Sequence, residues 1–173
     1  METITWKNSD LSGVRFDFEN NNQTFGTLTL MSELSSNANF TTDNYRLQFK
    51  RVGFWDNKVL IRKNDELIGE IGNRLVGRTF LKFKTGRTFR LSSNVIGRNL
   101  KWLGSEGQPI VEYTMATLNS MRKGFIKVND NLSMEEREVL LSAGLIAGRF
   151  NTYRLTFGLF FLGFMLYMTS KSI

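Results

Sequence analysis

An uncharged apolar block near the end of the chain limits the folds that the sequence can adopt. Residues 155–168 read LTFGLFFLGFMLYM, and the nearest charges are Arg154 and Lys171. Because most of the preceding sequence reads as short strands, such a helix belongs either inside a barrel or in a lipid bilayer. It would be about 24 Å long, whereas a bilayer core of about 30 Å usually takes about 20 apolar residues. Its length therefore favours burial within the protein, with a membrane anchor as the alternative.

Alternation of apolar and polar residues recurs through the first three quarters of the chain. In YRLQFK at 45–50, the first, third and fifth residues are apolar and the others are polar or cationic. Phe80 breaks this pattern in the segment 78–84. One apolar face and one wet face are typical of strands in an antiparallel sheet or a barrel wall. We predict strands at Thr3–Lys7, Gly13–Glu19, Phe25–Met31, Tyr45–Val52, Lys58–Lys63, Glu66–Ile71, Arg78–Lys84, Arg87–Ser92, Asn99–Leu103, Pro109–Met115 and Gly124–Val128.

Turn-forming pairs occur at a spacing of 21 residues in the middle of the chain. The three pairs, each between two strand-like runs, are Asn64-Asp65, Thr85-Gly86 and Glu106-Gly107. Asn and Gly tolerate the positive φ that tight hairpin turns need. The spacing therefore predicts regular hairpins in a meander. The polar segment 32–44, which precedes this meander, is predicted to be a long loop.

Helical signals replace the strand pattern after residue 128. Ser133 and Glu136 have the spacing of a capping box, in which each side chain accepts from the other residue's backbone N–H. We predict an amphipathic helix at 133–148, with an apolar stripe made by Leu140, Leu141, Gly144, Leu145 and Gly148. A second, apolar helix is predicted at 152–169.

The predicted fold is mainly β: an antiparallel β-barrel of about 11–12 strands around a central hydrophobic C-terminal helix. A barrel of that size is too wide to be filled by its own side chains, so the helix at 152–169 would occupy its interior. The strands would span residues 3–128. Residues 1–173 are predicted to form a single domain, because this length supports one core better than two.

This arrangement resembles the barrel shared by the tubby C-terminal domain, the plant LURP-one-related proteins and the phospholipid scramblases. In that superfamily, short strands close around a C-terminal hydrophobic helix. The resemblance covers most of the chain and is best from Tyr45 to Met168; it is carried by VLIRKNDELIGEI at 59–71 and by the apolar block at 155–168. It implies a tubby-like, lipid-binding and membrane-associated protein. The acidic calcium loop and the cysteine cluster of the scramblases have no counterpart in this sequence.

The chain contains neither cysteine nor histidine. Their absence excludes thiol nucleophiles, Ser-His-Asp triads, imidazole bases and disulfides, and it removes the usual ligands of zinc, copper and haem. Asp17 and Glu19 would share a strand face and could form an acid–base pair, although two separately solvated carboxylates are the simpler interpretation. We predict no enzyme activity, no catalytic residues, no metal and no cofactor.

Charge is distributed unevenly along the chain. Residues 1–45 carry a net charge of −4, residues 46–127 of +11 and residues 128–173 of 0, which together give +7. A cationic block of this kind favours an anionic partner, such as lipid headgroups, nucleic acid or acidic protein, although a solvated face that maintains solubility would look the same. Our candidates for anion or lipid contacts lie on one hairpin and beside it: Lys82, Lys84, Arg87, Arg90, Arg78 and Lys101.

Several functional hypotheses follow from these features. The first is a cytoplasmic, non-enzymatic barrel that binds an anionic membrane surface, a lipid headgroup or an acidic partner through its basic face. The second is a tail-anchored protein with a cytoplasmic β domain and residues 155–168 as the membrane span. A nucleic-acid-binding protein is the third, in which Phe80 and Trp102 could stack on bases beside the cations, although core positions are the simpler interpretation of both. The last is a metabolic enzyme that uses carboxylates or a small molecule bound in the barrel, which would require an open interior lined with polar groups.

Overall fold

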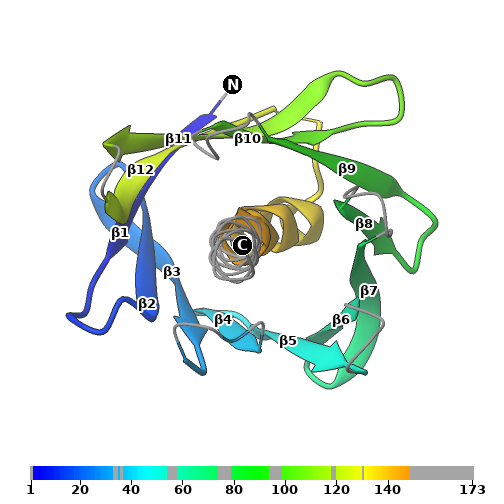
Figure 1. Ribbon diagram of the computed structural model, residues 1–173, viewed down its shortest axis with the longest axis horizontal. Helices are drawn as coiled ribbons and strands as arrows, with labels where there is room; N and C mark the ends of the chain where they lie inside the picture. The colour runs from blue at the N-terminus through cyan, green and yellow to red at the C-terminus, as the bar shows by residue number, and fades with distance from the viewer. Residues whose placement is uncertain are drawn as a thin grey trace, which may run out of the picture.

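A computed structural model describes residues 2–32, 35, 37–53, 58–73, 79–93, 99–117, 120–129 and 131–148. Twelve antiparallel strands form a closed barrel in the order β1-β12-β11-β10-β9-β8-β7-β6-β5-β4-β3-β2 (Figure 1). Each strand pairs with its neighbours in sequence, and β1 pairs with β12 to close the ring. The prediction of an antiparallel β-barrel with a C-terminal helix is therefore confirmed.

The strands are short and of similar length. They are β1 (Glu2–Asn8), β2 (Arg15–Asn20), β3 (Gln23–Leu30), β4 (Ala38–Thr42), β5 (Arg46–Val52), β6 (Lys58–Lys63), β7 (Glu66–Asn73), β8 (Thr79–Phe83), β9 (Thr88–Ser93), β10 (Asn99–Leu103), β11 (Pro109–Thr117) and β12 (Ser120–Val128). All except β4 overlap a segment that the sequence pattern predicted as a strand.

The segment 32–44 is not the long loop that we predicted, because it contains β4. Ala38 and Phe40 are buried in the core, whereas Asn39 and Thr41 alternate with them on the outer side. The strand pairs with β3 on one side and with β5 on the other. Two apolar residues in a polar segment are too short a pattern to be recognised in the sequence, and the neighbouring strands supply the burial that selects an extended backbone here.

Tight turns join the strands of the meander, as the turn pairs predicted. Asn64 and Asp65 both have positive φ, 47° and 69°, which is the combination of a two-residue turn between β6 and β7. Gly86 and Gly107 have φ of 94° and 83°. Because most side chains are strained in this left-handed region, these positions fix where each hairpin reverses.

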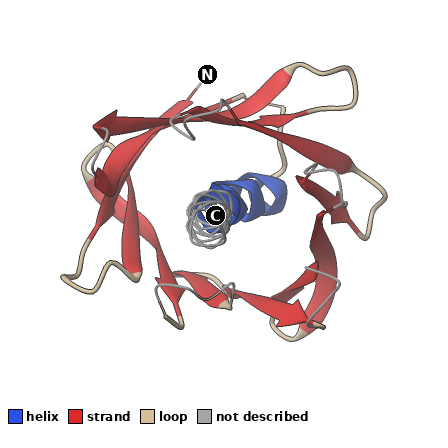
Figure 2. Ribbon diagram, viewed as in Figure 1, coloured by secondary structure: helices blue, strands red, loops and turns tan. Residues whose placement is uncertain are grey.

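Apolar side chains and a helix at 134–148 fill the barrel. The helix lies inside the ring of strands (Figure 2). The largest fully buried side chains of the wall include Trp6, Phe18, Phe40, Phe83, Trp102 and Tyr113. The apolar block at 155–168, for which we predicted a central helix or a membrane span, lies outside the described residues.

The helix at 134–148 falls in the segment for which we predicted one apolar stripe. Instead of lying with one face in solvent, it is enclosed by the barrel, and every residue from 138 to 148 is buried. The one hydroxyl in this stretch, Ser142 Oγ, donates to the carbonyl oxygen of Glu138 over 2.7 Å, so its burial leaves no donor without a partner.

Strands β10 and β11 hold this helix close to the barrel wall. Trp102 donates from Nε1 to the carbonyl oxygen of Leu140 over 3.2 Å. The hydroxyl of Tyr113 bonds the carbonyl oxygens of Leu140 and Leu141, the latter over 3.1 Å. A Cβ atom on Gly144 would overlap the Tyr113 ring, so this close approach requires glycine.

Candidate anion-binding face

The start of the helix at 134–148 closes one end of the barrel through polar contacts. Ser133 N–H donates to Glu136 Oε2 over 3.1 Å, and Glu136 N–H donates to Ser133 Oγ over 3.2 Å, which is the predicted capping box. Tyr45, which lies just before β5, donates a hydrogen bond from its hydroxyl to the Glu138 carboxylate. Ion pairs tie the same turn to β1, β6 and the start of β9; they are Arg137–Glu2 at 2.6 Å, Glu135–Lys63 at 2.8 Å and Glu136–Arg87 at 2.6 Å.

Two of the predicted anion contacts form close ion pairs with carboxylates of the protein itself. Arg87 Nη1 lies 2.6 Å from Glu136 Oε2, and the Glu136 side chain is largely buried. Lys101 Nζ lies 2.8 Å from Glu112 Oε2, its neighbour across β10 and β11. If Arg87 bound another partner, the buried Glu136 carboxylate would lose its cation. Arg87 therefore mainly stabilises the end of the barrel.

Lys82 on β8 and Arg90 on β9 are available to a partner. Both side chains are exposed, and neither forms an ion pair with any residue that the structure describes. Glu70 lies opposite Lys82 in the register, but Lys58 binds it, with Nζ 2.5 Å from Glu70 Oε2. Lys84 lies nearby in a loose, exposed pair of 3.5 Å with Glu66, and such pairs contribute little. The sixth candidate, Arg78, lies outside the described residues.

A cleft of about 470 Å³ lies between the turn that joins β8 to β9 and the turn that joins β10 to β11. Arg87 and Arg90 line it together with Thr88, Ser105 and Gln108. Guanidinium, hydroxyl and amide groups are all donors that suit an oxyanion. The structure therefore brings two of the six predicted residues to one concave site.

The two aromatic residues proposed for stacking occupy different environments. Phe80 is on the outer side of β8, half-buried, and its ring covers Gly72 on β7. Covering a strand glycine with a cross-strand aromatic protects the backbone there. Trp102, by contrast, is fully buried and bonded to the helix, so it is a core residue and cannot stack on a base. Its place on the alternating pattern of β10 puts it on the inner face, opposite to Lys101.

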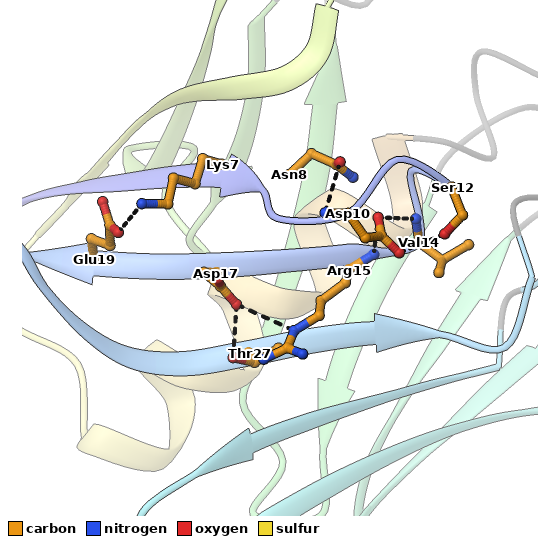
Figure 3. Close-up of polar contacts among 9 residues, drawn as sticks. All are labelled: Lys7, Asn8, Asp10, Ser12, Val14, Arg15, Asp17, Glu19 and Thr27. Atoms are coloured by element: carbon orange, nitrogen blue, oxygen red, sulfur yellow. Dashed lines mark hydrogen bonds and ion pairs between the residues drawn. The ribbon is translucent and has the colours of Figure 1, made fainter.

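Carboxylates on the outer side of β2 have cations of their own (Figure 3). Asp17 accepts from Thr27 Oγ1 over 2.9 Å and lies 3.7 Å from Arg15 Nε. Glu19 lies 2.5 Å from Lys7 Nζ. Each carboxylate has a different cation, and the side chains of Asp17 and Glu19 are only 16% and 19% exposed, so they are ion-paired and not separately solvated.

Glu138 links protonation to the stability of the barrel. Its side chain is buried, and burial raises its pKa above the ordinary glutamate value, although the hydrogen bond from Tyr45 opposes this shift. The folded state therefore binds this proton more tightly than the unfolded chain does. The protonated Glu138 carboxyl therefore adds to the free energy of unfolding. This contribution is complete below the ordinary pKa of about 4.3 and is lost as pH rises from there through the raised pKa.

We expect Glu138→Gln to gain stability relative to the wild-type protein as pH rises from about 4 to about 8. Glutamine keeps an acceptor for Tyr45 but has no charge to bury. Urea unfolding at several pH values measures the difference between the two proteins. Glu135→Gln is the control, because the Glu135 side chain lies in the same helical turn and is more exposed. A pH-independent difference for Glu138→Gln would contradict the expectation.

Phe125 was not singled out from the sequence, yet it is 50% exposed on the outer face of β12. Lys123 and Lys127 are exposed on the same face, two residues to either side. In KGFIKV at 123–128, the first, third and fifth residues share one face of the strand. That alternation was the signal that could have identified this residue.

No helix among the described residues combines the length and the hydropathy needed to cross a bilayer. In the same residues, no three side chains of the kinds that bind metals gather into a cluster that could hold an ion. Comparisons of the chain with protein-family models, with curated proteins and with solved structures found no match.

Proposed function

We propose that the protein is a non-enzymatic barrel that binds an anionic membrane surface through the outer side of β5–β9, which we call the basic face. The cations of this face that the structure describes as at least partly exposed include Lys50, Lys58, Lys82, Lys84 and Arg90. Strands β5–β9 contribute two carboxylates, Glu66 and Glu70, and each already has a lysine within ion-pair distance. The observation that carries the proposal is that Lys82 and Arg90 remain without such a partner in the described part of the chain.

The cations are spread across the basic face. The register places Lys50, Leu60, Glu70 and Lys82 in one row across β5–β8. Because neighbouring strands lie about 4.8 Å apart, the ends of this row are about 14 Å from each other. A membrane offers many headgroups at once, so it can neutralise separated cations, whereas one small anion cannot. Each such cation is worth about 1 kcal/mol near an anionic leaflet.

Apolar side chains accompany these cations. Leu67 is 40% exposed and borders a shallow pocket with Lys82 and Lys84. Phe80 lies beside Arg90 in the register of β8 and β9. Apolar groups next to lysine and arginine are typical of surfaces that rest at the boundary of headgroups and acyl chains. The proposal places the protein at the cytoplasmic leaflet, where anionic lipids concentrate, and includes the relationship to the tubby-like and scramblase-like barrels.

The double variant Lys82→Ala/Arg90→Ala is expected to reduce binding to anionic vesicles about 30-fold, because two contributions of about 1 kcal/mol are lost. Co-sedimentation with vesicles of phosphatidylcholine and phosphatidylserine at low salt measures this. Binding should also weaken for the wild-type protein as salt is raised, since screening shortens the range of attraction.

A matched control removes the same charge from the other side of the barrel. Lys7 and Arg15 lie on β1 and just at the start of β2, where each is paired with a carboxylate. Lys7→Ala/Arg15→Ala should leave vesicle binding within about twofold of wild type. Equal losses in the two double variants would show that net charge alone is responsible. If the wild-type protein does not bind anionic vesicles at low salt, the proposal is wrong.

A further inference from the structure

Phe125 stands out among the exposed apolar side chains because it is aromatic and lies between two exposed lysines. Its neighbours in the register are Thr5 on β1 and Thr114 on β11. Threonine side chains are short, so they do not cover a phenylalanine ring that projects between them. The 50% exposure of the ring agrees with this. The site lies on a different sector of the barrel from the basic face (Figure 1).

Neither Lys123 nor Lys127 has an ion pair with any described residue. The carboxylate nearest in register to Lys127 is Glu112, which Lys101 already binds at 2.8 Å. Within the part of the chain that the structure describes, two lysines without carboxylate partners therefore flank one accessible aromatic ring on β12. Each lysine Cα is about 7 Å along the strand from that of Phe125, because every residue rises about 3.4 Å.

From this arrangement we propose that Lys123, Phe125 and Lys127, the β12 platform, bind single-stranded nucleic acid. One base stacks on the Phe125 ring, and the phosphates before and after that nucleotide lie against Lys123 and Lys127. Aromatic rings that alternate with cations are how proteins hold single strands without reading sequence, because every base has a face that can stack. The polar neighbours Thr5 and Thr114 suit a ligand edged with hydrogen-bonding groups, whereas a membrane contact would favour more apolar neighbours.

The experiment uses the full chain and a fluorescently labelled oligothymidylate in an anisotropy titration at several salt concentrations. Phe125→Ala should weaken binding about tenfold, which is the range of one lost base stack. Lys123→Ala/Lys127→Ala should reduce the slope of log affinity against log salt by about 1.4, since each phosphate contact contributes about 0.7 on a single strand. Phe125→Ala should leave that slope unchanged.

Two further variants separate stacking from simple apolar contact. Phe125→Tyr keeps an aromatic face and should bind as the wild-type protein does. Phe125→Leu keeps apolar area without a planar ring and should bind as weakly as Phe125→Ala. Thermal unfolding of each variant checks that the barrel remains folded, which is expected for a half-exposed side chain. Wild-type affinity in Phe125→Leu would overturn the stacking model.

Other ligands distinguish this site from alternatives. Heparin carries dense negative charge and no bases, so its binding should be insensitive to Phe125→Ala. If Phe125→Ala instead weakens vesicle binding and leaves oligonucleotide binding intact, the platform contacts membranes and the proposal is wrong. The double variant Lys82→Ala/Arg90→Ala should retain oligonucleotide binding, so this inference and the membrane-binding function can fail separately. An absence of oligonucleotide binding by the wild-type protein at low salt would also overturn it.

Discussion

Replacing Gly144 by alanine is expected to lower the free energy of unfolding by about 3 kcal/mol, the upper end of the usual cost of overpacking a core. In an exposed helix the same change normally stabilises by about 1 kcal/mol, so the expected sign is reversed. The reason is the fully buried Tyr113, whose Cζ and hydroxyl occupy the space that the new methyl group needs. The helix or β11 would have to move, but the helix is enclosed by the barrel and β11 is hydrogen-bonded to a strand on each side.

Gly148→Ala is the matched control, one helical turn further along. Among the described residues, the nearest atom to its new methyl group is Leu100 Cδ1, at 2.5 Å, and the next is Cγ of the same residue at 3.8 Å. A flexible side-chain end can rotate away, so we expect a loss below about 1 kcal/mol. Urea midpoints of the two variants measure the difference. Similar stability for both would show that the barrel wall yields more easily than its packing indicates.

The second large effect is expected at Trp102. Trp102→Ala removes a fully buried indole between β10 and the helix and should cost about 4 kcal/mol, as large-to-small changes of aromatic residues do. The cavity would form where the wall and the helix meet, so neither side can close it alone. Chemical denaturation gives the loss directly, and a protein that no longer unfolds cooperatively would be an extreme form of the same result.

Phenylalanine substitutions separate packing from hydrogen bonding. Trp102 Nε1 donates to Leu140 over 3.2 Å, whereas Trp6 Nε1, also buried, has no hydrogen-bond partner among the described residues. Trp102→Phe should therefore cost about 1 kcal/mol more than Trp6→Phe. Equal costs would mean that the bond to Leu140 contributes nothing to stability.

The sequence predicted the strands of the barrel wall better than the helix inside the barrel. Strands with several apolar residues, such as β5, show a period of two that no helix would produce, and turns such as Asn64-Asp65 have few other uses. The helix at 134–148 was harder, because its apolar stripe predicted that only one face would be buried. In the structure Glu135, Glu136 and Glu138 lie near the start of the helix, at the mouth of the barrel. Polarity is segregated along the helix axis and not around it, which a pattern of faces does not reveal.

The candidate site was predictable only in outline. Net charge along the sequence located the basic strands, but whether a cation is free depends on pairs that are distant in the chain. Arg87 is bound by Glu136, which is 49 residues away, and this requires the helix to enter the barrel beside that hairpin. Glu70 lies opposite Lys82 and binds Lys58 instead. Which cation a carboxylate binds depends on the three-dimensional arrangement of several chemically similar lysines and arginines.

The pairing of β1 with β12 has a consequence for how the chain reaches its folded state. Glu2 lies opposite Val128, so the ring closes only after nearly the whole barrel has been synthesised. Contacts this remote in sequence make folding slow, because the entropy of a long loop is lost before the last ladder forms. Until then the growing sheet has two open edges that can pair with other chains. We therefore expect the nascent protein to be exposed to aggregation until its twelfth strand and the helix that fills the barrel have both left the ribosome.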